Sequence, residues 1–600
     1  MGQTHATRSH RIPALLITAC GAATSIAAPP FPASIEVGTL AAPTGLILEG
    51  AQNLLSHAGS SLCALGDVNG DGLDDFAIGA PDSDPHIQIR AGSTCVVFGA
   101  PDLGDAGPLE LMTVDGASGF VVNGAVSEDY AGSAVSSCGD FNGDGFNDIL
   151  IGAHLADPAG RSEAGAAYIL FGGTDIGSSG TIELSALTAE TGIIIRGAAP
   201  GDNAGRAVAG CGDINGDTYD DVIIGAPQAS PGGRSSAGSA YVIFGGPTAG
   251  ASGIIDLAAL TTSEGVTING IEPSDRTGRA VSGAGDLNAD GAPDLAVGAP
   301  FANPNALSNA GETFIVFGAA DLGASGPIEC SALAGTLGMR IQGGAEGDRS
   351  GCAVDRAGDI NGDGIDDLLI GSYLSDFGGV TDAGGAYIVF GAPGLGSAAG
   401  VLPLWSIDGT NGFVIAGKHI SSSTGVSCAS AGDVNGDGHP DIILGAPLVY
   451  RDGHFGVGEA YTVFGGPGVG SAGYVAVAAL DGAAGFTMRG ATYRDFCGAT
   501  VAGAGDVNAD GHDDFLVSAT GADPNGHFDA GRVYLIFGRA PGCASDLNSD
   551  DLTNAADFTI LAGNFGSAVA PSTSGDLNGD GLVDAADFVI LAGDFGCAAP

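Results

Sequence analysis

The chain has 600 residues, of which 44% are hydrophobic and only 14% are charged, so it can bury a large apolar core. Asp and Glu number 69 against 18 Lys and Arg, which gives a formal net charge of −51 at pH 7. Because so few basic residues cannot neutralise a run of phosphates, this balance argues against a nucleic-acid-binding role and favours the binding of cations.

The first 28 residues (1–28) have the pattern of a signal peptide. Arg8 and Arg11 precede an apolar run over residues 12–23, and small residues follow at a plausible cleavage site. Cys20 lies in a segment similar to a bacterial lipoprotein cleavage box, so a lipid on Cys20 is the alternative outcome. No later stretch has the roughly 18 uninterrupted apolar residues that a membrane helix needs. We therefore expect a secreted or cell-surface protein without a membrane span.

Eleven cysteines are spread along the chain, and removal of Cys20 with the signal peptide leaves ten. An even number of cysteines in an oxidising compartment favours disulfide bonds. The sequence therefore predicts disulfides, although it does not determine how eight of the ten cysteines pair.

A loop of the form Asp-x-Asn-x-Asp occurs seven times between residues 67 and 514. The loops follow one another at a spacing of 73 residues, with one step of 74. They open at Asp67, Asp140, Asp213, Asp286, Asp359, Asp433 and Asp506. A repeat of this length and regularity indicates an array of identical supersecondary units.

Each repeat contains four short apolar segments, which the third copy displays well. Residues 207–211 lead into the loop, 222–227 and 239–244 follow, and 254–260 with 266–270 supply the fourth segment. Segments of this length that are rich in Val, Ile, Phe and Tyr and bounded by Gly, Pro and Asp are typical of strands. Seven units of four strands predict an all-β seven-bladed β-propeller over residues 35–540.

The phase of the repeat predicts how the ring closes. The chain begins with a fourth-strand element, Leu46–Glu49, and the array ends after a third strand at Phe537. We expect Leu46–Glu49 to complete the seventh blade, which would remove the exposed edges of the array. The alternative, an open superhelix of seven units, leaves one surplus strand and one missing strand unexplained.

The seven loops are candidate calcium sites. Asp67, Asn69 and Asp71 supply oxygen ligands at positions 1, 3 and 5, the carbonyl of Leu73 follows at 7 and Asp75 at 9, as in most of an EF-hand loop. Magnesium fits less well because its octahedral shell accepts fewer protein oxygens, and the pattern argues against zinc because it contains no Cys or His. The other six sets are Asp140, Asn142, Asp144 and Asp148; Asp213, Asn215, Asp217 and Asp221; Asp286, Asn288, Asp290 and Asp294; Asp359, Asn361, Asp363 and Asp367; Asp433, Asn435, Asp437 and Asp441; and Asp506, Asn508, Asp510 and Asp514.

Two features qualify the calcium prediction. Thr218 stands in the third loop where the other loops have Gly, so this site is expected to be weaker. The alternative to metal binding is a set of Asx turns, which Asp and Asn favour without any ion. Convergent carboxylates repel one another unless a cation neutralises them, so we expect up to seven Ca²⁺ ions in the propeller.

The succession of loop, Ile-Gly-Ala-Pro and Tyr-Val-Ile-Phe-Gly motifs resembles the FG-GAP repeats of integrin α-subunit propellers and of their bacterial relatives. The resemblance covers about residues 35–540. It implies a seven-bladed propeller that binds calcium between the first two strands of each blade and meets a protein or glycan ligand on the opposite face. Much of the scarce basic charge, including Arg206, Arg279 and Arg349, falls in the loops of that opposite face.

The last sixty residues, 541–600, have a different character. Two loops are each followed by an apolar helical stretch, and their ligand candidates are Asp546, Asn548, Asp550 and Asp557, then Asp576, Asn578, Asp580 and Asp587. The pair resembles a dockerin module, which implies up to two further Ca²⁺ ions and a cohesin-like scaffold partner. The first copy departs from the pattern, with Asp551 where Gly is expected. Cys543 and Cys597 bracket the module and are expected to form a disulfide; the alternative is a calcium-stabilised tail without a partner.

The functional hypothesis is a secreted or cell-surface calcium-binding propeller that acts in adhesion or ligand binding and is tethered through its tail. The sequence contains no nucleophile elbow, metalloprotease helix or His triad, so we assign no catalytic residue and no cofactor besides Ca²⁺. Two alternatives remain. The chain could be a glycan-directed hydrolase carried by the dockerin-like module, because loop carboxylates could include a catalytic pair, or it could be a structural surface spacer.

Overall fold

A computed structural model describes residues 31–51, 56–396, 400–539, 555–565 and 583. The chain separates into one unit spanning Pro30–Ala540 and a second that includes Pro541–Pro600. The predicted signal peptide, residues 1–28, lies outside the described residues. In the second unit the structure describes helix α1 (Ala555–Asn564).

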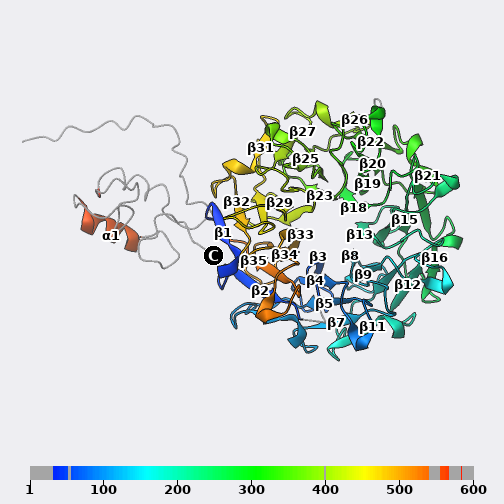
Figure 1. Cartoon of the computed structure of the whole chain (residues 1–600), viewed down its shortest axis with the longest axis horizontal. Coiled ribbons are helices and arrows are strands. Elements are labelled where there is room, and N and C mark those ends of the chain that lie inside the picture. Colours follow the sequence, from blue (N-terminus) through cyan, green and yellow to red (C-terminus); the bar gives the residue numbers. More distant parts are fainter. Residues whose placement is uncertain (1–30, 52–55, 397–399, 540–554, 566–582, 584–600) are drawn as a thin grey trace, which may run out of the picture. The chain divides into compact units, whose positions relative to one another are not determined.

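The first unit is a ring of seven blades, each a five-stranded sheet (Figure 1). From the centre outward, blade one contains β3 (Ser61–Gly66), β4 (Asp75–Ala80), β5 (Ser93–Val97), β7 (Gly119–Asn123) and β11 (Thr181–Glu183). Blade two contains β8 (Ala134–Gly139), β9 (Asp148–Ala153), β10 (Ala166–Leu170), β12 (Gly192–Arg196) and β16 (Ile254–Asp256). Blade three contains β13 (Ala207–Gly212), β14 (Asp221–Ala226), β15 (Ser239–Ile243), β17 (Gly265–Asn269) and β21 (Ile328–Glu329).

The remaining blades follow the same order. Blade four contains β18 (Ala280–Gly285), β19 (Asp294–Ala299), β20 (Glu312–Val316), β22 (Gly338–Gln342) and β26 (Val401–Pro403). Blade five contains β23 (Val354–Gly358), β24 (Asp367–Gly371), β25 (Gly385–Val389), β27 (Gly412–Ala416) and β31 (Tyr474–Ala476). Blade six contains β28 (Cys428–Gly432), β29 (Asp441–Ala446), β30 (Glu459–Val463), β32 (Gly485–Arg489) and β1 (Ser34–Glu36). Blade seven contains β33 (Cys497–Gly505), β34 (Asp514–Ala519), β35 (Arg532–Ile536), β2 (Gly45–Glu49) and β6 (Leu109–Glu110).

Short 3-10 turns occupy two recurring places. One set follows the fifth strands: η1 (Val37–Thr39), η3 (Leu111–Thr113), η5 (Leu184–Ala186), η7 (Leu257–Ala259), η9 (Cys330–Ala332), η11 (Leu404–Ser406) and η12 (Val477–Ala479). The other set lies between second and third strands: η2 (Pro85–Ile87), η4 (Pro158–Gly160), η6 (Pro231–Gly233), η8 (Pro304–Ala306), η10 (Phe377–Gly379) and η13 (Pro524–Gly526).

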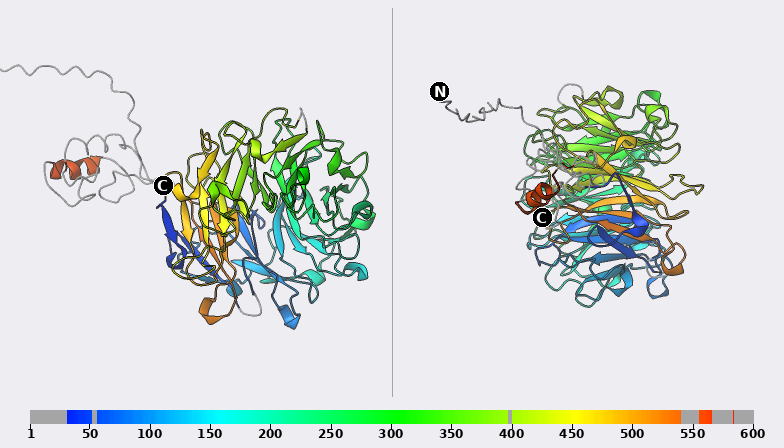
Figure 2. Two further views of the ribbon diagram at one scale, coloured as in Figure 1. Left: turned by 45° about the horizontal axis from the view of Figure 1, so that its top comes forward. Right: turned by 90° about the vertical axis from the view of Figure 1, so that its left-hand side faces the viewer.

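The second strand of each blade lies in the middle of the core. In β4 and its six counterparts every residue is buried, which explains why these segments are continuously apolar rather than alternating. The blades stand side by side around the ring (Figure 2). Seven hydrophobic clusters fill the spaces between adjacent blades, one at each interface. Gly79 of the Gly-Ala-Pro motif shows how closely the blades pack, because a Cβ there would lie 2.1 Å from the carbonyl oxygen of Gly132.

The two ends of the ring meet in blade seven. Strand β2 pairs antiparallel with β35 over five residue pairs, from Gly45 opposite Ile536 to Glu49 opposite Arg532. This is the pairing expected from the phase of the repeat. Glu49 also forms an ion pair of 2.8 Å with Arg532.

The sequence predicted four strands in each blade, whereas the structure has a fifth strand in each. The fifth strand of each blade is short, runs parallel to the fourth, and comes from the connection that leads into the next blade's fourth strand. The segment 254–260, for example, divides into β16, which joins blade two, and η7. The ordered ring also begins before residue 35, because Phe31 is buried and stacks on Phe486 at 4.3 Å.

The prediction of disulfides is wrong for the eight cysteines of the ring, which are all unpaired. Most of them are buried on separate strands, where they pack as small apolar side chains. Burial raises the thiol pKa of Cys63 to about 11 and that of Cys95 to about 12, which keeps both thiols protonated. The expected pair Cys543 and Cys597 lies outside the described residues. In the part of the chain that the structure describes, no helix is long and apolar enough to cross a membrane.

Candidate metal loops and ligand face

Each Asp-x-Asn-x-Asp loop joins the first strand of a blade to the second, so all seven loops lie on one face of the ring. The Asp at position 1 organises its own loop. The Oδ1 atom of Asp67 accepts hydrogen bonds from the backbone of Gly70 (2.6 Å) and Asp71 (3.2 Å), and its Oδ2 atom accepts one from Gly72 (2.9 Å). The bonds from positions 5 and 6 recur in all seven loops.

The Asn at position 3 and the Asp at position 5 are held beside this turn. The Asn69 amide nitrogen lies 3.1 Å from Oδ2 of Asp71, whose Oδ1 accepts a hydrogen bond of 3.0 Å from the backbone of Leu73. In the fifth loop the Asn361 amide instead reaches the position-9 carboxylate of Asp367 at 3.3 Å. The loop backbone thus holds the side chains of positions 1, 3 and 5 within one turn, and in the fifth loop the amide at position 3 also reaches position 9.

The Asp at position 9 is the first residue of the second strand, and its side chain is completely buried. Asp75 is 0% exposed and accepts hydrogen bonds from the backbone of Val68 (3.0 Å) and of Gly99 (2.9 Å). Gly99 is the glycine of the Phe-Gly motif, and the same bond occurs in the other six blades. The Phe-Gly motif therefore fixes the ninth-position carboxylate from the third strand.

Burial and neighbouring charge both disfavour the ionised form of these carboxyl groups. Burial is the larger cause, and the carboxylates at positions 5 and 1 add to it, so the pKa of Asp75 and of Asp148 rises to about 7 and that of Asp514 to about 8. The pKa of Asp441 is likewise raised well above its usual range. A buried carboxyl group beside two further carboxylates is stable in its charged form only when a cation compensates it.

The second loop contains an oxygen without a partner. The Oδ2 atom of Asp148 is buried and accepts no hydrogen bond, whereas the equivalent atom of Asp75 has one. Among the described residues no three His, Cys, Asp or Glu side chains form a metal cluster by themselves. Each loop, however, adds an Asn amide and a backbone carbonyl to its three carboxylates, and an all-oxygen set of this kind suits Ca²⁺.

The third loop keeps this geometry despite Thr218. Its backbone still donates a hydrogen bond of 2.7 Å to Asp213, but Thr218 adopts a φ of 80°, a conformation that favours glycine. The substitution therefore strains the loop without removing any ligand candidate.

Sequence reasoning missed the residue at position 8. Where this residue is Asp, its carboxylate accepts a hydrogen bond from the position-1 backbone of the neighbouring blade's loop, at 2.7–3.0 Å. Four residues do so: Asp74, Asp220, Asp366 and Asp513. Asp74 of blade one bonds Asp506 of blade seven, so the calcium-loop face is also joined across the closure. The pattern was visible in the sequence, but only the tertiary structure shows that position 8 faces the adjacent loop.

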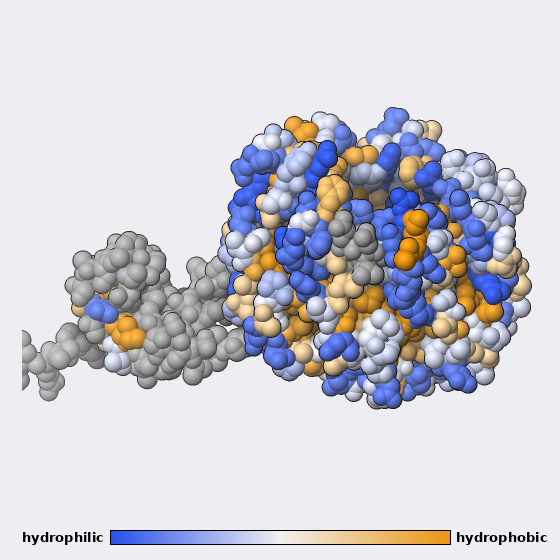
Figure 3. All heavy atoms as spheres, turned by 60° about the horizontal axis from the view of Figure 1, so that its bottom comes forward, coloured by the Kyte–Doolittle hydropathy of each residue, from blue (hydrophilic) through white to orange (hydrophobic). Residues whose placement is uncertain are grey.

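The opposite face is formed by the loops between second and third strands and by the interblade loops, which lead from each fourth strand to the next blade. Arg276 and Arg349 lie 4.8 Å and 5.1 Å from the ring centre of Phe301. Burial and the charge of Arg279 lower the pKa of Arg206 to about 10. Basic side chains from the loops of blades three to five therefore lie near one another on the face opposite the calcium loops, as the sequence suggested. The view in Figure 3 shows polar and apolar residues mixed over the side of the molecule that it displays.

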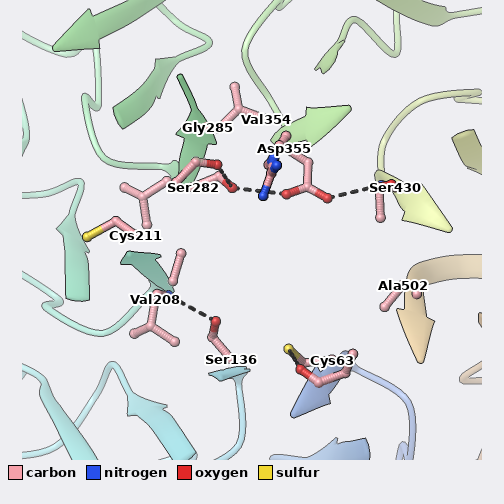
Figure 4. Close-up of a pocket in the computed structure, with 18 of the residues that line it drawn as sticks. Cys63, Ser136, Val208, Cys211, Ser282, Gly285, Val354, Asp355, Ser430 and Ala502 are labelled. Carbon is pink, nitrogen blue, oxygen red and sulfur yellow. Dashed lines mark hydrogen bonds between the residues drawn. The ribbon is translucent and has the colours of Figure 1, made fainter. Parts of the chain in front are cut away.

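The channel at the centre of the ring is lined by the first strands and has a volume of about 510 Å³ (Figure 4). Asp355 accepts hydrogen bonds from the hydroxyl of Ser282 (2.9 Å) and the backbone of Ser430 (3.2 Å). Asp355 and Arg356 are the charged side chains among the described lining residues. The channel therefore lacks the two facing carboxylates that glycoside hydrolysis requires.

The ligand candidates of the C-terminal module lie outside the described residues. They are Asp546, Asn548, Asp550, Asp576, Asn578, Asp580 and Asp587, together with the side chain of Asp557. The predicted dockerin-like calcium sites and the scaffold partner thus stay predictions.

Comparison with known proteins identifies the repeat. The model of the family described as FG-GAP repeat matches seven segments, residues 58–94, 131–170, 204–243, 277–316, 356–389, 429–477 and 498–536, one in each blade. Integrin alpha-PS2 of Drosophila melanogaster is 34% identical over 252 residues, which are 41% of this chain and 15% of that protein. Phosphatidylinositol-glycan-specific phospholipase D of Bos taurus is 35% identical over 173 residues, which are 28% of this chain and 18% of that enzyme.

The chain thus spans less than a fifth of the length of these two relatives. A solved structure, the type II cohesin-dockerin domain from Bacteroides cellolosolvens, is 44% identical over 9% of this chain and 87% of its own, with a TM-score of 0.09 that supports no conclusion about fold. The seven family matches, the seven blades and the integrin homology agree. The chain is therefore a seven-bladed β-propeller of FG-GAP repeats, homologous to the integrin α chains.

Proposed function

We propose that this protein is an extracellular calcium-binding propeller that binds a protein or glycan ligand in adhesion and is tethered through its dockerin-like tail. The observation that carries the proposal is the difference between the loops on the two faces of the ring. Seven near-identical acidic loops occupy one face, whereas the loops of the other face differ from blade to blade. Functional variation on a rigid scaffold concentrates in such loops.

In this proposal the calcium ions are structural. In each loop the side chains at positions 1, 3, 5 and 9 and the carbonyl at position 7 would hold one ion, which neutralises the buried carboxylate at position 9. A ligand at a hundred times its Kd adds about 2.7 kcal/mol per site to the stability of the folded state. Seven such sites would contribute much of the stability of the ring.

The calcium proposal is tested by metal analysis and thermal unfolding of the full chain with Ca²⁺ and after chelation. We expect several bound Ca²⁺ ions per chain and a lower Tm after chelation. Asp148→Asn should remove one ion, whereas Asp105→Asn, a control at an exposed position outside the loops, should remove none. A chain without bound calcium, and with a Tm that chelation leaves unchanged, would refute the proposal.

The ligand-binding role is tested on glycan and protein arrays with the calcium-loaded chain. The second candidate function, a hydrolase, is favoured by the similarity to an enzyme named phosphatidylinositol-glycan-specific phospholipase D. We favour binding, because the matched part is less than a fifth of that enzyme and the described central channel holds no catalytic pair. Turnover of phosphodiester or glycoside substrates by the purified chain would reverse this preference.

The location and the tether have separate tests. Mass spectrometry of the mature protein should find a cleaved N-terminus near residue 28, whereas a lipid on Cys20 would indicate the alternative anchor. The tail is proposed to bind a cohesin module in the presence of Ca²⁺. A pull-down of the full chain with purified cohesins, with and without chelator, measures that binding, and a lack of any calcium-dependent capture would contradict it.

A further inference from the structure

A pocket of about 370 Å³ lies between blades four and five, on the face opposite the calcium loops. Four parts of the chain line it: the interblade loop at Gly344–Asp348, the loop at Leu374–Asp382 between the second and third strands of blade five, Tyr387 in β25 and Trp405 in η11. Its size is within the range of small-molecule sites, which is roughly 300–1,000 Å³.

The pocket contains aromatic residues at positions where the other repeats do not have them. Trp405 is the middle residue of η11, and the corresponding positions of the other six turns hold Gly38, Met112, Ser185, Ala258, Ser331 and Ala478. Phe377 begins η10, whereas η2, η4, η6, η8 and η13 all begin with Pro. In a repeat protein the scaffold explains what the copies share, so two departures that line one pocket point to a local function.

A third departure opens the floor of the pocket. Gly344 follows β22, and a Cβ at this position would lie 3.2 Å from the hydroxyl of Tyr387 and 3.9 Å from the backbone nitrogen of Trp405. The equivalent residues after β17 and β12 are Ile271 and Ala198, which carry a side chain at this position. Glycine here therefore leaves room between Tyr387 and Trp405.

Of the three aromatic side chains, Trp405 alone forms an open platform. Trp405 is 57% exposed, whereas Tyr387 is 6% exposed and packs edge to face against Phe377, with their ring centroids 5.4 Å apart. A cage for a compact organic cation needs several aromatic faces around one point. A single exposed indole face instead suits a flat ring whose C–H groups can stack on it.

The polar groups around the platform are hydrogen-bond acceptors. Glu346, Asp348, Asp376 and Asp382 line the pocket, and the described lining residues include no Lys, Arg or His. Burial raises the pKa of Asp348 to about 6, which leaves it mostly ionised at neutral pH. Carboxylates accept strong hydrogen bonds from hydroxyl groups and repel anions, so a neutral polyhydroxylated ligand matches this lining better than a uronic acid or a sulfated sugar.

We propose that the pocket between blades four and five is a binding site for a neutral saccharide, which stacks on Trp405 and donates hydroxyl hydrogen bonds to the surrounding carboxylates. This inference deepens the proposed ligand-binding function and rests on it. It assigns the ligand class and the site.

The single tryptophan of the chain provides a direct test, because tryptophan fluorescence reports on Trp405 alone. The calcium-loaded full chain is titrated with cellobiose, xylobiose, chitobiose, lactose and maltose, and separately with tetramethylammonium chloride. We expect a saturable change in emission with at least one disaccharide. No saturable response to any disaccharide, or a stronger response to tetramethylammonium, would overturn the proposal.

Variants taken from the other repeats locate the site by calorimetry. Trp405→Ser, which installs the residue of η9, should abolish binding, and Gly344→Ala should weaken it about tenfold, or ~1.4 kcal/mol. Met112→Ser, the matched change at another blade interface, should leave affinity unchanged. Sugar binding that Trp405→Ser does not alter would overturn this site while leaving the ligand-binding function in place, whereas a chain that binds nothing on arrays or in titrations would remove both.

Discussion

Strand β2 closes the ring, and truncation of Leu48 tests how much this strand contributes to the stability of the ring. Leu48 is 0% exposed and belongs to the hydrophobic cluster between blades seven and one, together with Phe76 and Leu535. Within blade seven, β2 is held by its pairing with β35, by this cluster and by the Glu49–Arg532 ion pair. Leu48→Ala would leave the backbone pairing in place and remove part of the cluster.

The expected cost follows from the size of the side chain and the absence of solvent around it. Replacing a fully buried Leu by Ala removes transfer free energy and leaves a cavity, which together cost about 3 kcal/mol. Urea unfolding at saturating Ca²⁺, followed by circular dichroism, measures this loss. Ile268→Ala is the matched control, because Ile268 occupies the same place in β17 of blade three and is also 0% exposed.

Hydrogen–deuterium exchange distinguishes a residue of the closing strand from an ordinary core residue. The β2–β35 pair joins segments from opposite ends of the ring, so Leu48→Ala should accelerate exchange at Arg532–Ile536 and in β2 together. Ile268→Ala should accelerate exchange in blade three alone. A Leu48→Ala variant within about 0.5 kcal/mol of the wild type, without faster exchange at β35, would refute the reasoning.

Three further predictions follow from particular contacts. Asp74→Ala removes the acceptor for the backbone of Asp506 across the closure, so the free energy of unfolding in urea should fall by about 1 kcal/mol, whereas Asp105→Ala should not change it. The hydrogen bond between His57 and Asp82 (2.8 Å) raises the pKa of His57 above 6.5 and lowers that of Asp82 below 3.8. The ion pair between His57 and Asp82 therefore stabilises the folded state fully between pH 3.8 and 6.5. This stabilisation is lost as pH rises through the raised pKa of His57. It is also lost as pH falls through the lowered pKa of Asp82. The unfolding midpoints of wild type and His57→Gln should differ most between pH 3.8 and 6.5 and converge at alkaline pH; a constant difference would contradict this assignment. Thiol titration should find at least eight reactive cysteines in the denatured chain and few in the native one, and fewer than eight after unfolding would mean that ring disulfides exist.

The architecture could be predicted because its signal is local and repeated. The strand segments, their bounding glycines and the loop at every 73 residues each reflect interactions within one blade, and seven copies reinforce one another. The closure by Leu46–Glu49 followed from the order of elements along the chain. Those inferences needed no knowledge of which side chains meet between blades.

The candidate metal ligands could be named from the sequence because they lie close together along the chain, whereas the residues that hold them in place could not. Positions 1, 3, 5 and 9 lie in one loop, so their spacing alone indicates an oxygen cage. The glycine of the Phe-Gly motif lies 24 residues later, and its bond to Asp75 appears only when the third strand folds back beside the second. The role of Asp74 depends on a blade at the other end of the chain.

The prediction of ring disulfides failed because an even number of cysteines does not indicate which of them lie close enough to pair. Most ring cysteines are buried on separate strands, whereas a disulfide requires two Cβ atoms within about 4.5 Å. The fifth strands were not predicted because a segment of two or three residues is too short to show the alternation or β-branched enrichment of a strand. Their partners belong to the preceding blade.

By itself, then, the sequence determined the seven-fold repeat, the strands, the acidic loops and the order in which the ring closes, because all of these depend on short-range periodicity. The tertiary structure decided which blades exchange strands, which carboxylates join neighbouring loops and where Gly344, Phe377 and Trp405 meet. Those three residues are separated by up to 61 positions along the chain, from 344 to 405, and only the packing of blade four against blade five brings them to one pocket.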